Sequence, residues 1–87
     1  MKYRLEILPT ARREIASLPV KDRERVDERI RALADNPRPA GAIALRGYRN
    51  LFRLRTGKYR IIYQIRDEVL VVMVVKVGHR RDVYRGF

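Results

Sequence analysis

Residues 51–63 read LFRLRTGKYRIIY, two runs of alternating apolar and basic residues separated by Thr56-Gly57. Alternating runs on either side of a short glycine-containing turn are typical of a β-hairpin. With Thr56 and Gly57 as the turn, side-chain alternation places the cations on one face and the apolar groups on the other. The cations are Arg53, Arg55, Lys58 and Arg60, with Arg53 predicted opposite Arg60 and Arg55 opposite Lys58.

Like charges placed directly opposite each other cost a hairpin on the order of half a kcal/mol per pair. Two such pairs in a row are a poor choice for a hairpin with only a structural role. They are expected where a polyanion binds, although a basic hairpin can also be no more than a solvated face. The pattern therefore favours a polyanion-binding surface.

The net charge of the whole chain indicates the same class of partner. The 87 residues are enough for one domain, 1–87, with a modest core. Lys and Arg number 21 against 10 Asp and Glu, a net charge of +11, and residues 46–87 hold eleven of the cations but only three of the anions. Seventeen of the cations are arginine, which suits bidentate contacts with phosphate. Nucleic acid is the leading class of partner, and a membrane surface is the second.

Several classes of protein are disfavoured by composition. The chain has no cysteine and one histidine, so disulfides are excluded and a protein-bound zinc site is not expected. No signal peptide or membrane-spanning run is visible. We expect a cytoplasmic protein that needs no metal or cofactor.

The remaining elements follow from the spacing of apolar residues. Clean alternation predicts a first strand that ends before Pro9, and i, i+4, i+7 spacing predicts a short helix stopped at Pro19. The order β-α-α-β-β-β predicts an α+β domain with two N-terminal helices packed on one face of a mainly antiparallel four-stranded sheet. The expected elements are a strand at 2–7, helices at 11–18 and 20–34, a loop at 40–48, and strands at 49–55, 58–66 and 69–77.

The residues available suit one kind of RNA cleavage. Attack by the RNA's own 2′-hydroxyl requires removal of its proton, stabilisation of the crowded phosphorane and a proton for the 5′-oxygen, with no obligatory metal. Arg53, Arg60 and Arg80 are fixed cations that could stabilise the phosphorane. Arginine itself is a poor general base because it does not deprotonate at neutral pH. The proton-transfer candidates are His79, Tyr84 and Lys58.

These candidates also have simpler interpretations. A lone histidine such as His79 is more often incidental than catalytic. Tyr59 and Tyr63 lie on the apolar side of the hairpin, where core packing is expected. Tyr84 could either stack on a base or be a surface residue without a functional role.

Five segments together suggest a family relationship: Leu45–Gly47, Arg53–Arg55, Tyr59–Gln64, the valine-rich strand and Val77–Tyr84. Taken together they resemble the RelE/ParE superfamily of toxins over nearly the whole chain. The resemblance implies a RelE-like fold and a ribosome-dependent endoribonuclease that cuts mRNA without metal. It also implies an antitoxin partner that wraps and neutralises the toxin and, together with it, represses their shared operon.

The resemblance also implies roles for individual residues. Arg60 holds the transition-state phosphate, Arg80 assists it, and Tyr84 stacks on or orients the substrate nucleotide. Arg53 and Arg55 lie where such enzymes carry basic catalytic and rRNA-contacting residues. These enzymes usually offer lysines on this strand, so His79 is the candidate substitute as proton acceptor. The RNA-binding candidates are Arg49, Arg55, Lys58, Arg81 and Arg85.

Two other functions stay open. A ParE-like chain shares the fold but poisons DNA gyrase by binding, without nuclease activity. A basic module that only binds RNA or DNA would leave RNA intact and would show a steep salt dependence. For the leading interpretation we expect an acidic antitoxin, because the basic half of the chain lacks internal neutralisation.

Overall fold

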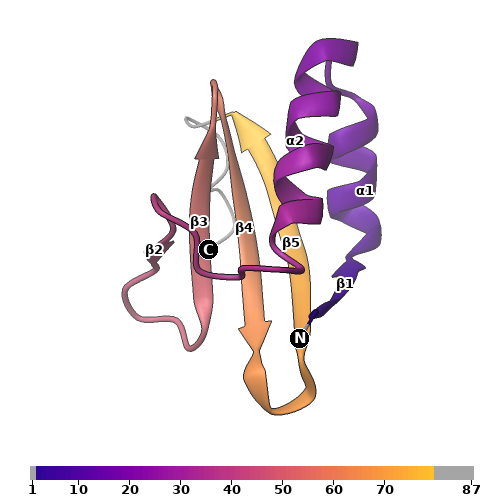
Figure 1. Cartoon of the computed structure of the whole chain (residues 1–87). Helices are drawn as coiled ribbons and strands as arrows, with labels where there is room; N and C mark the ends of the chain where they lie inside the picture. Colours follow the sequence, from indigo (N-terminus) through magenta and orange to yellow (C-terminus); the bar gives the residue numbers. More distant parts are fainter. Residues whose placement is uncertain (1, 80–87) are drawn as a thin grey trace.

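The computed structural model describes residues 2–79, in which two helices cover one face of a five-stranded sheet (Figure 1). This arrangement confirms the expected α+β fold. The elements are β1 (Arg4–Ile7), α1 (Pro9–Ala16), α2 (Val20–Ala32), β2 (Ile43–Ala44), β3 (Leu51–Thr56), β4 (Tyr59–Arg66), the 3₁₀ turn η1 (Asp67–Val69) and β5 (Val71–His79).

The strand order is β1-β5-β4-β3-β2, with β1 parallel to β5 and the other neighbours antiparallel. The mainly antiparallel sheet is therefore confirmed, but the expected count of four strands was wrong. Within the segment expected to be a loop, Ile43 pairs with Arg53 and Ala44 with Phe52. A two-residue strand is too short to produce a recognisable alternation in sequence.

The helix boundaries differ from expectation at both ends of the first helix, Pro9–Ala16, and at the C-terminal end of the second. α1 begins at Pro9, where a break was predicted. Proline is tolerated there because the first turn of a helix leaves its N–H groups unpaired in any case. α2 begins directly after Pro19 and ends at Ala32, two residues earlier than predicted.

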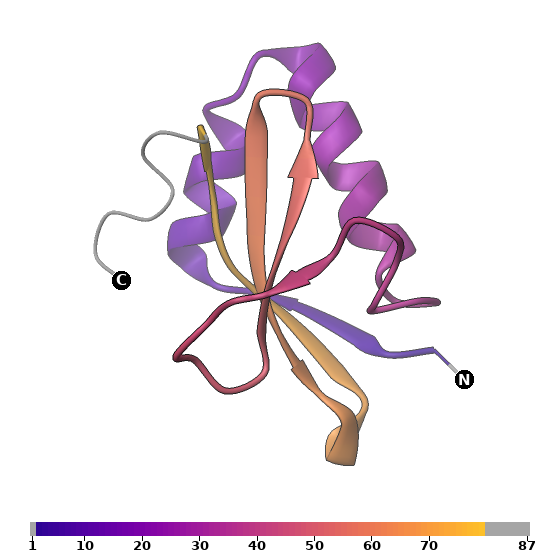
Figure 2. The same cartoon turned by 90° about the vertical axis from the view of Figure 1, so that its left-hand side faces the viewer.

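The core lies between the helices and the sheet. Figure 2, viewed from the β2 side, shows the β3–β4 hairpin standing in front of both helices. Fully burying one aliphatic or aromatic side chain stabilises the fold by about 1.5–3 kcal/mol, so this core holds the helices against the sheet. The core side chains come from the helices and the α2 end (Ala11, Ile15, Val26, Ile30, Leu33) and from the sheet (Leu54, Ile61, Tyr63, Ile65, Val72, Val74, Val77).

α1 also holds the half of β5 that extends beyond β1. Glu14 accepts a hydrogen bond from the Val77 backbone N–H at 3.0 Å and from Lys76 Nζ at 3.1 Å. The carboxylate thus replaces a neighbouring strand at this edge and fixes the end of β5.

Within residues 2–79, no helix is both long enough and apolar enough to cross a membrane.

Candidate nucleic-acid interface

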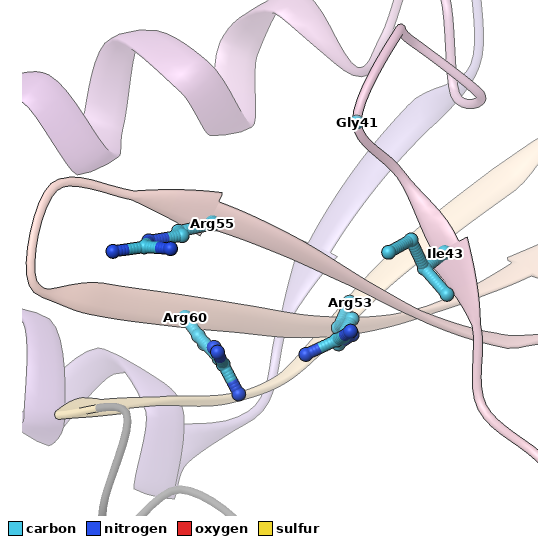
Figure 3. A pocket seen from close by; sticks show the side chains of 5 residues that line it. All are labelled: Gly41, Ile43, Arg53, Arg55 and Arg60. Atoms are coloured by element: carbon cyan, nitrogen blue, oxygen red, sulfur yellow. The ribbon is translucent and has the colours of Figure 1, made fainter.

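Three arginines line a pocket of about 290 Å³ on the β3–β4 hairpin, together with Gly41 and Ile43 (Figure 3). Figure 3 shows the side chains of Arg53 and Arg60 pointing toward one another, while Arg55 lies along the hairpin toward its turn. The pocket is therefore a concave surface with a cationic floor.

Strand pairing explains why the three arginines meet. Arg55 lies directly opposite Arg60, and Arg53 lies opposite Ile62. Directly opposed residues, and residues two apart on a strand, share a face of the sheet. Because Leu54 lies opposite Ile61 in the helix-facing core, the arginines occupy the face that turns away from the helices. Their predicted common face is confirmed.

The predicted turn of the hairpin was wrong by one residue, so the predicted partner of each β3 residue was wrong by two. Thr56 pairs with Tyr59, so the turn residues are Gly57 and Lys58 rather than Thr56 and Gly57. Gly57 has φ +60°, which suits the first central position of a type II′ turn, where glycine is preferred. Only one pair of cations, Arg55 and Arg60, is therefore directly opposed, and Lys58 lies exposed in the turn.

The chemistry of the pocket follows from the guanidinium group. Each arginine offers five N–H donors in a planar fork that matches the oxygens of a phosphate, and it stays charged at any physiological pH. Arg55 Nε donates at 3.5 Å to the Gly57 carbonyl, which directs this side chain along the hairpin. The arrangement suits binding of a phosphate and stabilisation of additional negative charge on it.

Gly41 and Ile43 form the pocket wall that the sequence did not predict. They enter the site because β2 pairs with β3 and because Gly41 adopts a left-handed conformation (φ +93°) in the preceding turn. The only available signal was a glycine in a proline-rich segment, which predicts a turn but not what the turn faces.

An ion pair fixes the connector that leads to this wall. Arg38 donates to both carboxylate oxygens of Asp67, at 2.7 and 3.3 Å, and its guanidinium lies 5.5 Å from the centre of the Phe52 ring. Tyr3 donates to the same carboxylate at 2.5 Å. The hydrogen bonds from Arg38 and then from Tyr3 hold the pKa of Asp67 below its usual value. We call Tyr3, Arg38 and Asp67 the clamp.

The tyrosines and the histidine lie on the other face. Tyr63 is fully buried and donates to the Pro37 carbonyl at 2.8 Å, and burial raises its pKa to about 12. Burial, and then the Asp22 carboxylate, raise the pKa of Tyr59. His79 lies opposite Tyr59, edge-on to its ring at 6.2 Å between centroids.

The structure does not bring His79 together with the arginine pocket. Across the same strands it is Gly78, without a side chain, that lies opposite Arg60. The predicted catalytic role of His79 thus lacks support from the geometry and stays a prediction.

The other predicted residues fall into two groups. Arg49 is exposed in the loop before β3 and is not among the residues that line the pocket. Arg80, Arg81, Tyr84 and Arg85 lie outside the described residues.

Among residues 2–79 no group of three or more acidic or histidine side chains could hold a metal ion.

Comparisons with known proteins connect this geometry to a family. Residues 5–84 match the family described as ParE toxin of type II toxin–antitoxin system, parDE. Toxin RelG of Mycobacterium tuberculosis is 35% identical over 86 residues, which cover 98% of this chain and 99% of the relative. The mRNA interferase toxin RelE of Escherichia coli is 34% identical over 88 residues, covering 97% and 92%.

Solved structures show the same relationship. The toxin–antitoxin complex RelBE2 from Mycobacterium tuberculosis contains a chain that is similar with a TM-score of 0.80 and 32% identity, covering 92% of this chain and all of that one. The archaeal RelE–RelB complex from Pyrococcus horikoshii gives a TM-score of 0.82 at 30% identity, covering 92% and 97%. The chain therefore belongs to the RelE/ParE superfamily of type II toxins, in its RelE-like branch.

Proposed function

We propose that this toxin is a metal-independent endoribonuclease that cuts mRNA on the ribosome and thereby inhibits translation. The observation that carries the proposal is the convergence of Arg53, Arg55 and Arg60 on one pocket. The Escherichia coli relative named mRNA interferase supports it at 34% identity.

The proposed reaction is a transesterification within the RNA. The 2′-oxygen loses its proton and attacks the adjacent phosphorus, and the bond to the 5′-oxygen breaks as that oxygen gains a proton. The products are a 2′,3′-cyclic phosphate and a 5′-hydroxyl. Negative charge accumulates on the non-bridging oxygens in the transition state, where preorganised donors contribute most.

The pocket residues have distinct proposed roles. Arg60 and Arg53, whose side chains converge, bind the non-bridging oxygens, and Arg55 contacts the backbone beside them. Since guanidinium groups do not transfer protons at neutral pH, the base and acid must be other groups. Tyr84 and His79 remain predicted candidates for proton transfer, and the ribosome is a further source of a base or acid. Arg80 remains a predicted contact with the phosphate.

The proposed protein partner is a cognate acidic antitoxin. Relatives have been solved as RelE–RelB complexes from Pyrococcus horikoshii and as RelBE2 from Mycobacterium tuberculosis. The net charge of +11 on this chain makes an acidic partner the electrostatically favoured one. We further propose that the pair binds its operator through the antitoxin.

The decisive experiment is induction of the toxin in cells followed by mapping of mRNA 5′ ends. The unsubstituted protein should produce new 5′ ends within translated frames. Arg60→Ala should lower cleavage by about 100- to 1,000-fold, the usual effect of removing one donor to a developing oxyanion. Arg13→Ala, which removes an exposed cation from α1, is the matched control and should cleave normally.

The same cultures test the alternative that the family description favours. Residues 5–84 match the ParE toxin family. If the protein were a gyrase poison, induction would give gyrase-linked DNA breaks while mRNA stayed intact. A folded Arg60→Ala protein that remained fully toxic would contradict the nuclease assignment. If both mRNA and DNA stayed intact after induction, the remaining interpretation would be a basic module that only binds nucleic acid.

A further inference from the structure

The turn of the β3–β4 hairpin gathers cations from both layers of the fold. From the arginine face, Arg55 Nε donates to the Gly57 carbonyl at 3.5 Å. From the helix layer, Arg25 Nη1 of α2 lies 4.0 Å from the position that a Cβ on Gly57 would occupy. Lys58 follows Gly57 in the turn, and all three cationic residues are exposed. We call Arg25, Arg55 and Lys58 the cationic tip.

The charge of the cationic tip is not balanced by neighbouring carboxylates. Within residues 2–79, none of its three side chains takes part in an ion pair. Asp22 lies one helical turn before Arg25, but it accepts a hydrogen bond from Tyr59 at 3.4 Å. Arg55 also has Arg60 directly opposite it. This is the distribution of charge that a bound polyanion would stabilise.

The cationic tip is continuous with the pocket, because Arg55 belongs to both. A chain of phosphates that occupies the pocket and runs along Arg55 reaches the turn within two residues of β-strand, or about 7 Å. Beyond Gly57 the next cations are Lys58 and Arg25. The path therefore leads from the open face of the sheet, around the turn, to α2.

We propose that the cationic tip binds the phosphodiester backbone of single-stranded RNA outside the scissile site, with Arg25 and Lys58 each contacting one phosphate. This inference rests on the proposed function in taking RNA as the ligand. It adds a contact on α2, an element that plays no part in the pocket. Arg25 is suited to the task because its guanidinium can hold one phosphate bidentately.

The test measures binding of non-cleavable 2′-O-methyl RNA by fluorescence anisotropy over a range of NaCl concentrations. Each phosphate contact on a single strand contributes about 0.7 to the slope of log K against log salt. The double variant Arg25→Gln/Lys58→Gln should lower the slope for a 12-mer by about 1.4. It should leave binding of a tetranucleotide, which fills only the pocket, unchanged.

The matched control is Arg13→Gln/Arg31→Gln, which removes the same charge from exposed helix positions away from the turn. Its salt slope for 12-mer binding should stay within about 0.3 of the slope for the unsubstituted protein, which is less than half of what one phosphate contact contributes. Circular dichroism on both variants should show unchanged helix content.

Three results would overturn the inference. The first is a salt slope for 12-mer binding by Arg25→Gln/Lys58→Gln that equals the slope of the control variant. The second is a decrease in the slope for the tetranucleotide as large as the decrease for the 12-mer. The third is loss of binding to a polyglutamate peptide with RNA binding intact, which would assign the cationic tip to an acidic protein partner. None of these depends on cleavage, so the inference can fail while the 5′-end mapping upholds the proposed nuclease.

Discussion

At the scale of single residues, Asp67 joins three distant parts of the chain. It accepts hydrogen bonds from Tyr3 in the first segment and from Arg38 in the connector, while lying itself at the β4–β5 turn. The connector then continues to Gly41 and Ile43 in the pocket wall. The clamp thus holds a loop that has only two residues of strand to anchor its other end.

The clamp should make stability depend on pH in a defined direction. The pKa of Asp67 is lower in the folded protein than the ordinary value of 3.8. A depressed folded pKa contributes stability above the unfolded pKa and loses it as pH falls through the folded one. Thermal unfolding should show Asp67→Asn melting below the unsubstituted protein at pH 6, with the difference closing below about pH 4.

Glu68→Gln is the control for this titration. Glu68 is the next residue and pairs with Arg66, two positions away, at 3.2 Å, without joining distant segments. Its melting temperature should stay close to that of the unsubstituted protein at pH 6. A gap for Asp67→Asn that did not narrow at all between pH 6 and about pH 2 would show that the clamp acts through packing rather than through charge.

Individual side chains of the pocket were predictable only where they follow strand alternation. Arg53, Arg55 and Arg60 could be assigned to one face because alternation needs no knowledge of the partner strand. Gly41 and Ile43 could not, because they reach the pocket through pairing of β2 with β3.

At the scale of elements, the β3–β4 hairpin shows why the presence of a hairpin is easier to predict from sequence than the pairing of its residues. Both strands were recognised from their alternation. Taking Thr56 and Gly57 as the turn puts glycine at the second central position, whereas the observed turn has glycine at the first central position. The one-residue difference in the turn changes which arginines are opposed. The β2 strand and the η1 turn left no periodic signal, so the strand count and the start of β5 were not predictable.

The turn geometry predicts a specific sensitivity at Gly57. Its φ of +60° is strained for any residue with a Cβ. Gly57→Ala should therefore destabilise the fold by about 1–2 kcal/mol, which corresponds to a fall in melting temperature of at least about 4–8 °C for a domain of this size. Differential scanning fluorimetry can measure the shift.

Lys58→Ala provides the comparison at the adjacent turn position, which does not have a positive φ. It should change stability by no more than about 0.5 kcal/mol, as exposed positions usually do. Equal shifts for the two variants would mean that the left-handed conformation does not set the turn.

At the scale of the whole molecule, a net charge of +11 is carried on a body only 34 × 27 × 25 Å across. Charges within about 10 Å of each other are screened little at 0.1 M salt, while those on opposite sides are screened almost fully. Repulsion is therefore concentrated where cations crowd, above all at Arg55 opposite Arg60.

This repulsion should make the free toxin more stable at higher ionic strength. The melting temperature should rise between about 20 and 300 mM NaCl, as the Debye length falls from roughly 20 Å to well under 10 Å. Arg55→Gln should melt higher than the unsubstituted protein in low salt, and the advantage should shrink as salt is added. Arg13→Gln, which removes an exposed cation from α1 rather than from the hairpin, should show a smaller advantage.

A flat salt response, or the same advantage for both variants, would count against local repulsion. It would indicate that the hairpin cations are already neutralised in the isolated protein.

The parallel pairing of β1 with β5 has a consequence for biosynthesis. β1 is translated well before its backbone partners, which run from Leu70 to Val74. β5, which lies between β1 and β4, is also absent until then, so the helices lack part of the sheet surface on which they pack. Non-local pairing of this kind delays folding. A growing chain should thus stay unfolded until β5 has been made, and it should be inactive up to that point.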